Sequence, residues 1–330
     1  MKAILNHLFE HKNLDRSQAN SLMMQLAEGR FNNSELSSLI TVFLMRSISI
    51  DELMGFKDAL LELALEPELE EYGAIDIVGT GGDGKNTFNI STLACLVVAG
   101  AGFKVSKHGN YGASSISGAS NAMEFLGYRF KNKSDELRKE IDQTNFCFLH
   151  APLFHPALKN VASVRKELGF RTIFNMLGPL VNPAKPACQL IGVYNLEMAR
   201  IYNYLLQQDK RPFCIVHSLE GYDEISLTGD TKMITSSGEH IKSAIELAGI
   251  VVKPEEISGG KTVAESARIF LDILQNEGTQ AQKMVVLANA ASALLLTGSF
   301  TSYQDAFAAA QKSLLSGSAY QCFKKLIDLQ

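Results

Sequence analysis

The chain has 330 residues, of which 46% are hydrophobic, so it can bury a large core and is long enough for two structural lobes. Its formal net charge of −4 argues against a nucleic-acid-binding surface, and no stretch of about 18 apolar residues predicts a membrane span. The five cysteines are scattered without a C-x-x-C pair, and the N-terminus lacks the apolar core of a signal peptide. We therefore expect a reduced, cytoplasmic compartment.

Residues 1–66 are predicted to be helical throughout. Apolar positions such as Leu5, Leu8 and Phe9 recur at three- and four-residue steps, and the segment Asp15–Asn20 is typical of a helix start. No convincing strand occurs in this region.

From residue 74 the pattern changes to short apolar or β-rich runs separated by helical stretches. The predicted strands are Ala74–Val78, Lys104–Ser106, Phe146–Leu149, Gln189–Val193, Phe213–His217 and Lys283–Leu287. Alternation of this kind predicts an α/β protein with a small N-terminal helical domain and a larger domain, whose mostly parallel central sheet is flanked by helices. We expect the helical domain to span 1–66, completed by helices within about 162–188, and the α/β domain to span 67–330.

A glycine-rich segment joins the first predicted strand to a predicted helix, Leu93–Gly100. Four glycines between Gly79 and Gly84 let the backbone approach a ligand without a clash from Cβ atoms. Asn89, Ser91 and Thr92 then lie at the helix N-terminus, where free N–H groups and the helix dipole attract anions. This segment therefore predicts a phosphate-binding loop.

Two familiar phosphate loops fit this segment only in part. The glycine spacing matches the dinucleotide fingerprint, but the next strand ends on basic residues where that fingerprint needs an acid for the ribose. The spacing up to Lys85 nearly matches a nucleotide-triphosphate loop, yet Asn86 stands where Ser or Thr must hold magnesium. A purely structural turn is the third alternative.

A second loop, from Lys107 to Gly118, follows the next predicted strand and adds a cation. The helix Ala119–Leu126 begins directly after it. Two such loops about 28 residues apart, at the ends of successive strands, converge on one crevice in a right-handed βαβ unit. Their convergence favours a ligand with two phosphate groups.

Together, several segments resemble the anthranilate phosphoribosyltransferase family over essentially the whole chain. The similar segments are Gly79–Asp83, Asn89–Thr92, Lys107–Asn110, Ala151–Pro156, Val164–Pro183 and the acid pair Asp223–Glu224. The resemblance implies an enzyme of tryptophan biosynthesis with a nucleoside phosphorylase/phosphoribosyltransferase-type fold. It would transfer the phosphoribosyl group of 5-phosphoribosyl 1-diphosphate to the amine of anthranilate, giving N-(5-phosphoribosyl)anthranilate and diphosphate. It also implies a homodimer, without nucleic-acid or membrane partners.

The resemblance assigns roles to individual residues. Donor-binding residues would be Gly79, Gly82, Asp83, Thr87, Asn89, Ile90, Ser91, Thr92, Lys107, His108, Gly109, Asn110, Tyr111, Gly112, Ala113, Ser114, Ser115 and Ala119. Anthranilate would contact Gly79, Asn110, His155 and Arg165, although His155 reads nearly as well as a packed structural histidine. Two magnesium ions per subunit would be held by Ser91 with Asp223 and Glu224, which we expect as exposed acids on a loop. No covalent nucleophile or general base is assigned.

The second loop departs from the commonest family pattern. Tyr111 stands where many members carry Arg, Ile116 where Lys or Arg is frequent, Ala119 where a phosphate-binding Ser is usual, and Asn121 where Asp is common. Ser120 would replace the lost hydroxyl. Two alternatives to the transferase stay open: a pyrimidine-nucleoside phosphorylase, against which the chain length argues, and a family-like protein that binds a ligand without catalysis.

Overall fold

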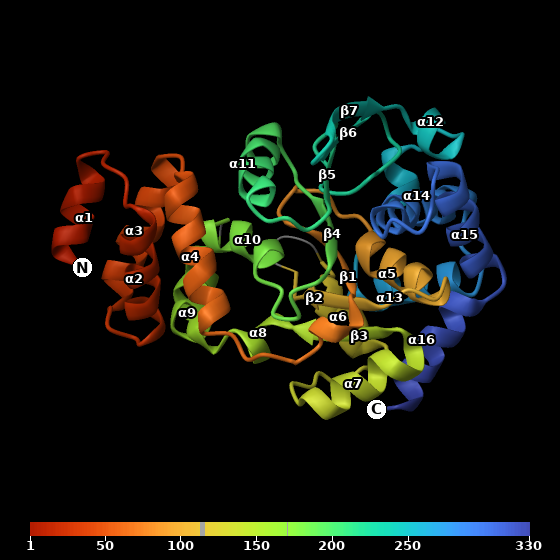
Figure 1. Ribbon diagram of the computed structural model, residues 1–330, viewed down its shortest axis with the longest axis horizontal. Coiled ribbons are helices and arrows are strands. Elements are labelled where there is room, and N and C mark those ends of the chain that lie inside the picture. Colours follow the sequence, from red (N-terminus) through yellow and green to blue (C-terminus); the bar gives the residue numbers. More distant parts are fainter. Residues whose placement is uncertain (113–115, 170) are drawn as a thin grey trace. The chain divides into compact units, whose positions relative to one another are not determined.

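The computed structural model describes residues 1–112, 116–169 and 171–330 (Figure 1). The chain forms two compact units, Met1–Glu66 with Ala151–Pro183, and Pro67–His150 with Ala184–Gln330. The segment that returns to the helical unit is therefore 151–183, where the sequence suggested about 162–188. No helix in the described part of the chain is both long and apolar enough to cross a membrane.

The first unit is built from helices, in agreement with its sequence periodicity. Its helices are α1 (Lys2–Phe9), α2 (Arg16–Ala27), α3 (Asn33–Met45), α4 (Ile50–Glu62), α8 (Ala151–Phe154), α9 (Lys159–Leu168) and α10 (Ile173–Leu177), with short 3-10 turns at Pro156–Leu158 and Gly178–Leu180. Asp15, Asn32 and Ser49 each cap a helix by accepting a backbone N–H, and each cap is completed by a Gln or Glu three residues later. The helix start predicted at Asp15–Asn20 is therefore confirmed.

The second unit contains a seven-stranded sheet in the order β3-β2-β1-β4-β5-β6-β7. The strands are β1 (Ile75–Gly79), β2 (Val105–Gly109), β3 (Phe146–His150), β4 (Cys188–Gly192), β5 (Phe213–Ser218), β6 (Thr231–Thr235) and β7 (Gly238–Lys242). Strands β1 to β5 pair in parallel, whereas β6 and β7 add an antiparallel edge. The predicted α/β class with a mostly parallel sheet is confirmed.

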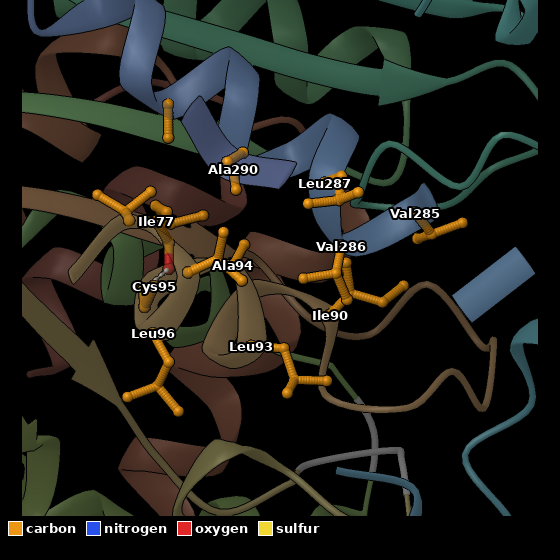
Figure 2. Packing of buried hydrophobic residues seen from close by; sticks show 14 of the residues in the cluster. Ile77, Ile90, Leu93, Ala94, Cys95, Leu96, Val285, Val286, Leu287 and Ala290 are labelled. Atoms are coloured by element: carbon orange, nitrogen blue, oxygen red, sulfur yellow. Dashed lines mark hydrogen bonds between the residues drawn. The ribbon is translucent and has the colours of Figure 1, made fainter. Parts of the chain in front are cut away.

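The helices of this unit cover the sheet (Figure 1). They are α5 (Ile90–Gly100), α6 (Ala119–Phe125), α7 (Ser134–Thr144), α11 (Leu196–Gln207), α12 (Ala244–Ala248), α13 (Val263–Leu274), α14 (Gln280–Leu296), α15 (Tyr303–Leu315) and α16 (Ser318–Asp328), with 3-10 turns at Glu70–Tyr72 and Pro254–Ile257. The main core lies between β1, α5 and α14, where Ile77, Cys95 and Leu96 share one cluster with Val286 and Ala290 (Figure 2).

One prediction of local structure is wrong, and one element was missed. The expected strand Lys283–Leu287 lies inside helix α14, because a helix buried on nearly every side carries a continuous apolar run that its period cannot distinguish from a strand. The hairpin β6–β7 was not predicted from the sequence. Its outer strand is mostly exposed and polar, so it lacks the apolar signal of a core strand.

Candidate functional site

The order in which successive strands are added to the sheet reverses between β1 and β4. Strands β2 and β3 extend it on one side of β1, and β4 and β5 extend it on the other. Open parallel sheets bind ligands outside the carboxyl ends of the strands at such a switch point. Gly79 and Gly192 are aligned there as the last residues of β1 and β4.

The absence of side chains at these two glycines makes room for the segment that follows β5. A Cβ atom on Gly79 would lie 2.4 Å from the Asp223 Oδ2, and one on Gly192 would lie 1.6 Å from the Asp223 carbonyl oxygen. The clash at Gly192 is with backbone, so that position requires glycine, whereas a Cβ atom on Gly79 would displace the Asp223 carboxylate from its place. The acid pair is thus held directly over the ends of the two central strands.

Asp223 and Glu224 lie on a loop, as expected, but the expectation that they are exposed is wrong. Asp223 is only 7% exposed, and its Oδ2 accepts the Gly81 N–H at 2.6 Å. Glu224 is half-buried, and its carboxylate interacts with the Ser91 hydroxyl and backbone N–H, which lower its pKa. Adjacent acids read as surface residues in a sequence, whereas here the loop folds inward over the strand ends.

Burial makes the acids in this region costly to ionise. Burial, and then the neighbouring Glu224 and Asp83, raise the pKa of Asp223 well above its ordinary value. Burial also raises the pKa of Asp83. For Glu224, burial raises the pKa to about 7, although the Lys107 ammonium and the bonds from Ser91 act in the opposite direction. A site of this kind favours either protons or an added cation.

The chemistry of these side chains fits Mg²⁺. Among residues that the structure describes, no three His, Cys, Asp or Glu side chains form a group that could hold a metal alone. Mg²⁺ does not require such a cage, because it prefers one or two carboxylates together with waters and substrate phosphate oxygens. Asp223, Glu224 and the Ser91 hydroxyl provide a donor set of this type.

Lys107 is the buried cation nearest to this chemistry. Its side chain is 2% exposed, and its Nζ donates to the Ile77 carbonyl at 2.7 Å and to the Ser91 Oγ at 3.3 Å. The ammonium therefore joins β2 to the end of β1 and to the first turn of α5. It places a positive charge beside Ser91 and Glu224, where an anionic ligand would gain from it.

The glycine-rich loop is fixed at its C-terminal end. The Gly259 N–H donates to the Asn86 carbonyl at 2.7 Å, and the Phe88 N–H donates to the Ile257 carbonyl at 3.2 Å. Helix α5 then begins at Ile90, three residues earlier than predicted. The Asn89 side chain donates to the Ser117 carbonyl at 3.0 Å, so it links the first loop to the second.

Every donor-binding residue predicted in the described part of the chain lies at one edge of this sheet. Gly79 ends β1; Gly82, Asp83 and Thr87 lie in the first loop; Asn89, Ile90, Ser91 and Thr92 open α5; Lys107, His108 and Gly109 end β2; Asn110, Tyr111 and Gly112 follow it; and Ala119 opens α6. The predicted residues Ala113, Ser114 and Ser115 lie outside the described residues.

The second loop is organised by side chains that the sequence did not identify. The Asn121 Oδ1 accepts the N–H groups of both Gly112 and Gly118 at 3.0 Å, so it joins the two ends of the loop. The sequence marked Asn121 only as a departure from the Asp that is common in the family, and this role was not predicted. A Cβ atom on Gly118 would lie 2.1 Å from the Gly112 nitrogen, which shows how closely the ends approach.

The structure bears on the roles expected for Ser120 and Tyr111 in this loop. Ser120 is fully buried and its hydroxyl is hydrogen bonded to the His150 Nδ1 at 2.9 Å, so it does not replace the missing phosphate-binding hydroxyl. The Tyr111 ring contacts His150 edge-on at 5.0 Å, and its hydroxyl lies 3.3 Å from a Glu124 carboxylate oxygen. The Tyr111 side chain thus packs against an aromatic cluster, although its backbone still follows the end of β2.

Arg165 and His155 belong to the helical unit. Arg165 is half-buried on α9, and its guanidinium lies 5.3 Å from the centre of the Phe174 ring. Burial lowers its pKa, and it has no ion pair within the described residues. His155 is 2% exposed and its Nε2 is bonded to the Val181 carbonyl at 2.9 Å, while burial lowers its pKa to about 4. A neutral, packed histidine supports the segment around Val181, and its contact with anthranilate stays a prediction.

The fold and these residues define a class of protein that comparison identifies. Residues 71–320 match the glycosyl transferase family, a/b domain, and residues 2–64 match the glycosyl transferase family, helical bundle domain. Anthranilate phosphoribosyltransferases from Cytophaga hutchinsonii and Bacteroides thetaiotaomicron are 54% and 52% identical to the chain, with 99% and 100% of it covered, and 100% and 99% of their own lengths. The chain therefore belongs to the anthranilate phosphoribosyltransferase family.

Solved structures of the same family share the fold. The anthranilate phosphoribosyltransferase of Thermus thermophilus aligns with a TM-score of 0.91 at 31% identity, covering 98% of each chain. The Saccharomyces cerevisiae enzyme in complex with PRPP and Mg aligns with a TM-score of 0.89 at 26% identity, covering 98% of this chain and 96% of that one. The same yeast enzyme with 4-fluoroanthranilate aligns at a TM-score of 0.85 and 25% identity, with the same coverage.

The raised pKa of Glu224 predicts a change of stability with pH. Its pKa is about 7 in the fold and about 4.5 in an unfolded chain, so the fold favours the protonated acid. The resulting contribution to stability is present below pH 4.5 and is lost as the pH rises through about 7. In metal-free buffer, Glu224→Gln should therefore gain stability over the parent protein, on the order of 1–3 kcal/mol, between pH 5 and pH 8.

Urea unfolding at both pH values measures this difference. Glu246 gives a matched control, because it is a surface acid whose carboxylate caps α12, so Glu246→Gln should not gain stability at pH 8. A parent protein and a Glu224→Gln variant with parallel pH profiles would mean that Glu224 is ionised without penalty.

Proposed function

We propose that this chain transfers the phosphoribosyl group from 5-phosphoribosyl 1-diphosphate to the amine of anthranilate. The products are N-(5-phosphoribosyl)anthranilate and diphosphate, and the reaction is the second step from chorismate to tryptophan. The observation that carries the proposal is the acid pair of buried Asp223 and half-buried Glu224, which lies beside a glycine-rich loop and a helix N-terminus at the strand ends. The family relationship and the PRPP, Mg and 4-fluoroanthranilate complexes of the yeast enzyme support it.

The donor would bind to the two loops at the ends of β1 and β2. The start of α5 directs backbone N–H groups and the positive end of its dipole toward an anion. Gly79 and the loop after it allow the backbone to approach the diphosphate, and Lys107 contributes the nearby positive charge. We assign the donor to the loop residues predicted from the sequence, including Ala113, Ser114 and Ser115.

Mg²⁺ would be held by Asp223, Glu224 and Ser91, and we propose two ions per subunit. When bound with the donor, the metal supplies positive charge for the departing diphosphate. The protein side chains determine where that charge lies, because the Asp223 carboxylate accepts the Gly81 N–H and the Glu224 carboxylate lies near Ser91. Magnesium in the yeast complexes supports this role.

Bond breaking at the ribose carbon places negative charge on the diphosphate and positive charge on the ring. The chain stabilises the negative charge on the diphosphate electrostatically. Lys107 and the N-terminal turn of α5 provide this stabilisation, and both are in position before the reaction. The anthranilate amine is largely unprotonated at neutral pH, so its attack requires orientation more than a strong base. No covalent nucleophile or general base needs to be assigned.

Anthranilate would be oriented through its carboxylate. Arg165 supports this assignment, because a half-buried guanidinium without an ion pair in the described residues lacks the partner that burial normally requires. Its planar set of donors suits a carboxylate. We further assign Gly79, Asn110 and His155 to the acceptor.

The assay that tests the function combines the purified protein with anthranilate, 5-phosphoribosyl 1-diphosphate and Mg²⁺, and follows the loss of anthranilate fluorescence. We expect loss that depends on both the donor and Mg²⁺, with diphosphate released in equal amount. Binding of both substrates without product would instead identify a ligand-binding protein.

The variant Arg165→Ala should weaken the use of anthranilate while sparing the donor. Truncating a charge-assisted pair costs about 2–4 kcal/mol, which corresponds to roughly a 30- to 1,000-fold lower kcat/KM for anthranilate. Steady-state kinetics with each substrate varied in turn give the result. Lys166→Ala, the exposed cation next along α9, is the matched control and should leave both values near those of the parent. An equal loss for both substrates would remove Arg165 from the acceptor site.

The double variant Asp223→Asn/Glu224→Gln should lose Mg²⁺-dependent turnover and remain folded. Amides keep the shape of the acids and remove the buried negative charge, so the variant should melt no lower than the parent in metal-free buffer at pH 8. Melting curves and activity at several Mg²⁺ concentrations measure both effects. Near-normal turnover at low Mg²⁺ would show that the pair does not hold the metal.

We also propose a homodimer in the cytoplasm. In the helical unit, Phe9, Leu44 and Met45 are large exposed hydrophobic residues on α1 and α3, and Met45 is 85% exposed. Such residues are suited to an interface between copies. Five free cysteines, four of them buried, fit a reducing compartment. Light scattering should give twice the mass of the chain, whereas the mass of a single chain would contradict the dimer.

A further inference from the structure

The acid pair continues into a short irregular segment that is buried. Ile225 follows Glu224 directly, has 0% exposure and lies outside every helix and strand. Buried backbone N–H and C=O groups must find hydrogen-bond partners, and this stretch has no sheet neighbour to provide them. The hydrogen-bond partners of the Ile225 backbone must therefore come from outside the sheet.

Asn289 of helix α14 supplies both bonds. The Ile225 N–H donates to the Asn289 Oδ1 at 3.1 Å, and the Asn289 Nδ2 donates to the Ile225 carbonyl at 2.9 Å. The second hydrogen of Nδ2 is given to the Val285 carbonyl one helical turn earlier, at 2.8 Å. The side-chain amide thus pairs with Ile225 as a neighbouring β-strand would.

The burial of Asn289 is unusual for its residue type. Its exposure is 0%, and the residues around it on α14 are alanines and aliphatic side chains of the main core. An amide in such surroundings destabilises the fold unless all its polar atoms are bonded. Both hydrogens and the oxygen are used here, and the Val285 carbonyl fixes which end of the amide faces Ile225. Its orientation is therefore determined by the helix itself.

A second side chain holds the same segment at the end of β5. The Ser218 Oγ donates to the Glu224 carbonyl at 2.7 Å and accepts the Ser226 N–H at 3.1 Å. Together, Ser218 and Asn289 bond the main chain of three consecutive residues immediately after the Asp223 carboxylate. Packing of α14 does not itself require the polar Asn289 side chain, because the helix already packs on the sheet through its apolar side chains.

We propose that Asn289, together with Ser218, is a positioning residue of the magnesium site: it holds the Asp223–Glu224 backbone so that both carboxylates face the bound metal and diphosphate. The inference rests on the proposed metal role of the acid pair. Carboxylates placed this close repel one another, so an unrestrained loop would relax by moving them apart. The Asn289 bonds resist that movement and keep the pair ready for the cation.

The test replaces Asn289 by Leu, which has a similar shape and no hydrogen-bonding atoms. Hydrogen exchange of the Ile225 amide should accelerate, because its acceptor is gone. Binding of Mn²⁺ in the presence of inorganic diphosphate, followed by electron paramagnetic resonance, should weaken about 10- to 100-fold, as expected for a group that orients metal ligands. The Mg²⁺ concentration for half-maximal activity should rise similarly, with the KM for anthranilate unchanged.

Two further variants make the result specific. Leu294→Ala removes a core side chain from the same helix, also with 0% exposure, and should lower the melting temperature without changing Mn²⁺ binding. Ser218→Ala tests the second contact by the same measurements. If the Asn289 variant does not fold, the result for Ser218→Ala determines whether the positioning role holds. Normal Mn²⁺ binding by the folded variants would overturn the inference.

The design separates this inference from the function on which it rests. If Asp223→Asn/Glu224→Gln also keeps normal Mn²⁺ binding, the acid pair is not the metal site and the proposed function loses its support. If that double variant loses Mn²⁺ while Asn289→Leu and Ser218→Ala bind it normally, only the positioning role is wrong.

Discussion

The repulsion between buried acids at the ends of two central strands is the constraint on which the site depends. Asp223 lies against Gly79 and Gly192, and its backbone approaches Gly192 so closely that no other residue type would fit there. Burial raises the pKa of both acids, with added repulsion from Glu224 and Asp83 at Asp223 and from Asp83 at Glu224, so the folded protein holds negative charge there only at a cost in free energy. Proteins rarely keep such a cost without a compensating ligand, and a divalent cation carrying a diphosphate supplies the missing charge.

The surrounding elements all restrict where that charge can lie. Strand β1 ends at Gly79, helix α5 starts with Ser91 near its N-terminus, and Lys107 joins the two through its bonds to Ile77 and Ser91. The core between α5 and α14 makes this arrangement rigid, because α5 is buried along most of its length (Figure 2). Helix α14 therefore contributes both apolar packing and, through Asn289, direct support of the loop that carries the acids.

Much of this arrangement could be predicted from the sequence. Glycines and small polar residues between a strand and a helix indicate phosphate binding through local geometry, and the capping signal at Asp15–Asn20 indicated the correct start of α2. The depth of Asp223 could not be predicted, because adjacent acids carry no local sign of burial; it follows from Gly192, more than 30 residues earlier in the chain. The role of Asn289 could not be predicted either, because part of the apolar run that forms its helix was interpreted as a strand.

The measurement that tests the account most directly is a crystal structure with Mn²⁺ and 5-phosphoribosyl 1-diphosphate, recorded at the manganese absorption edge. The account predicts anomalous density about 2.1 Å from carboxylate oxygens of Asp223 or Glu224, with diphosphate oxygens completing the coordination. Anomalous density bonded only to the diphosphate, with both acids directed away from it, would contradict the claim that these buried acids exist to hold the metal.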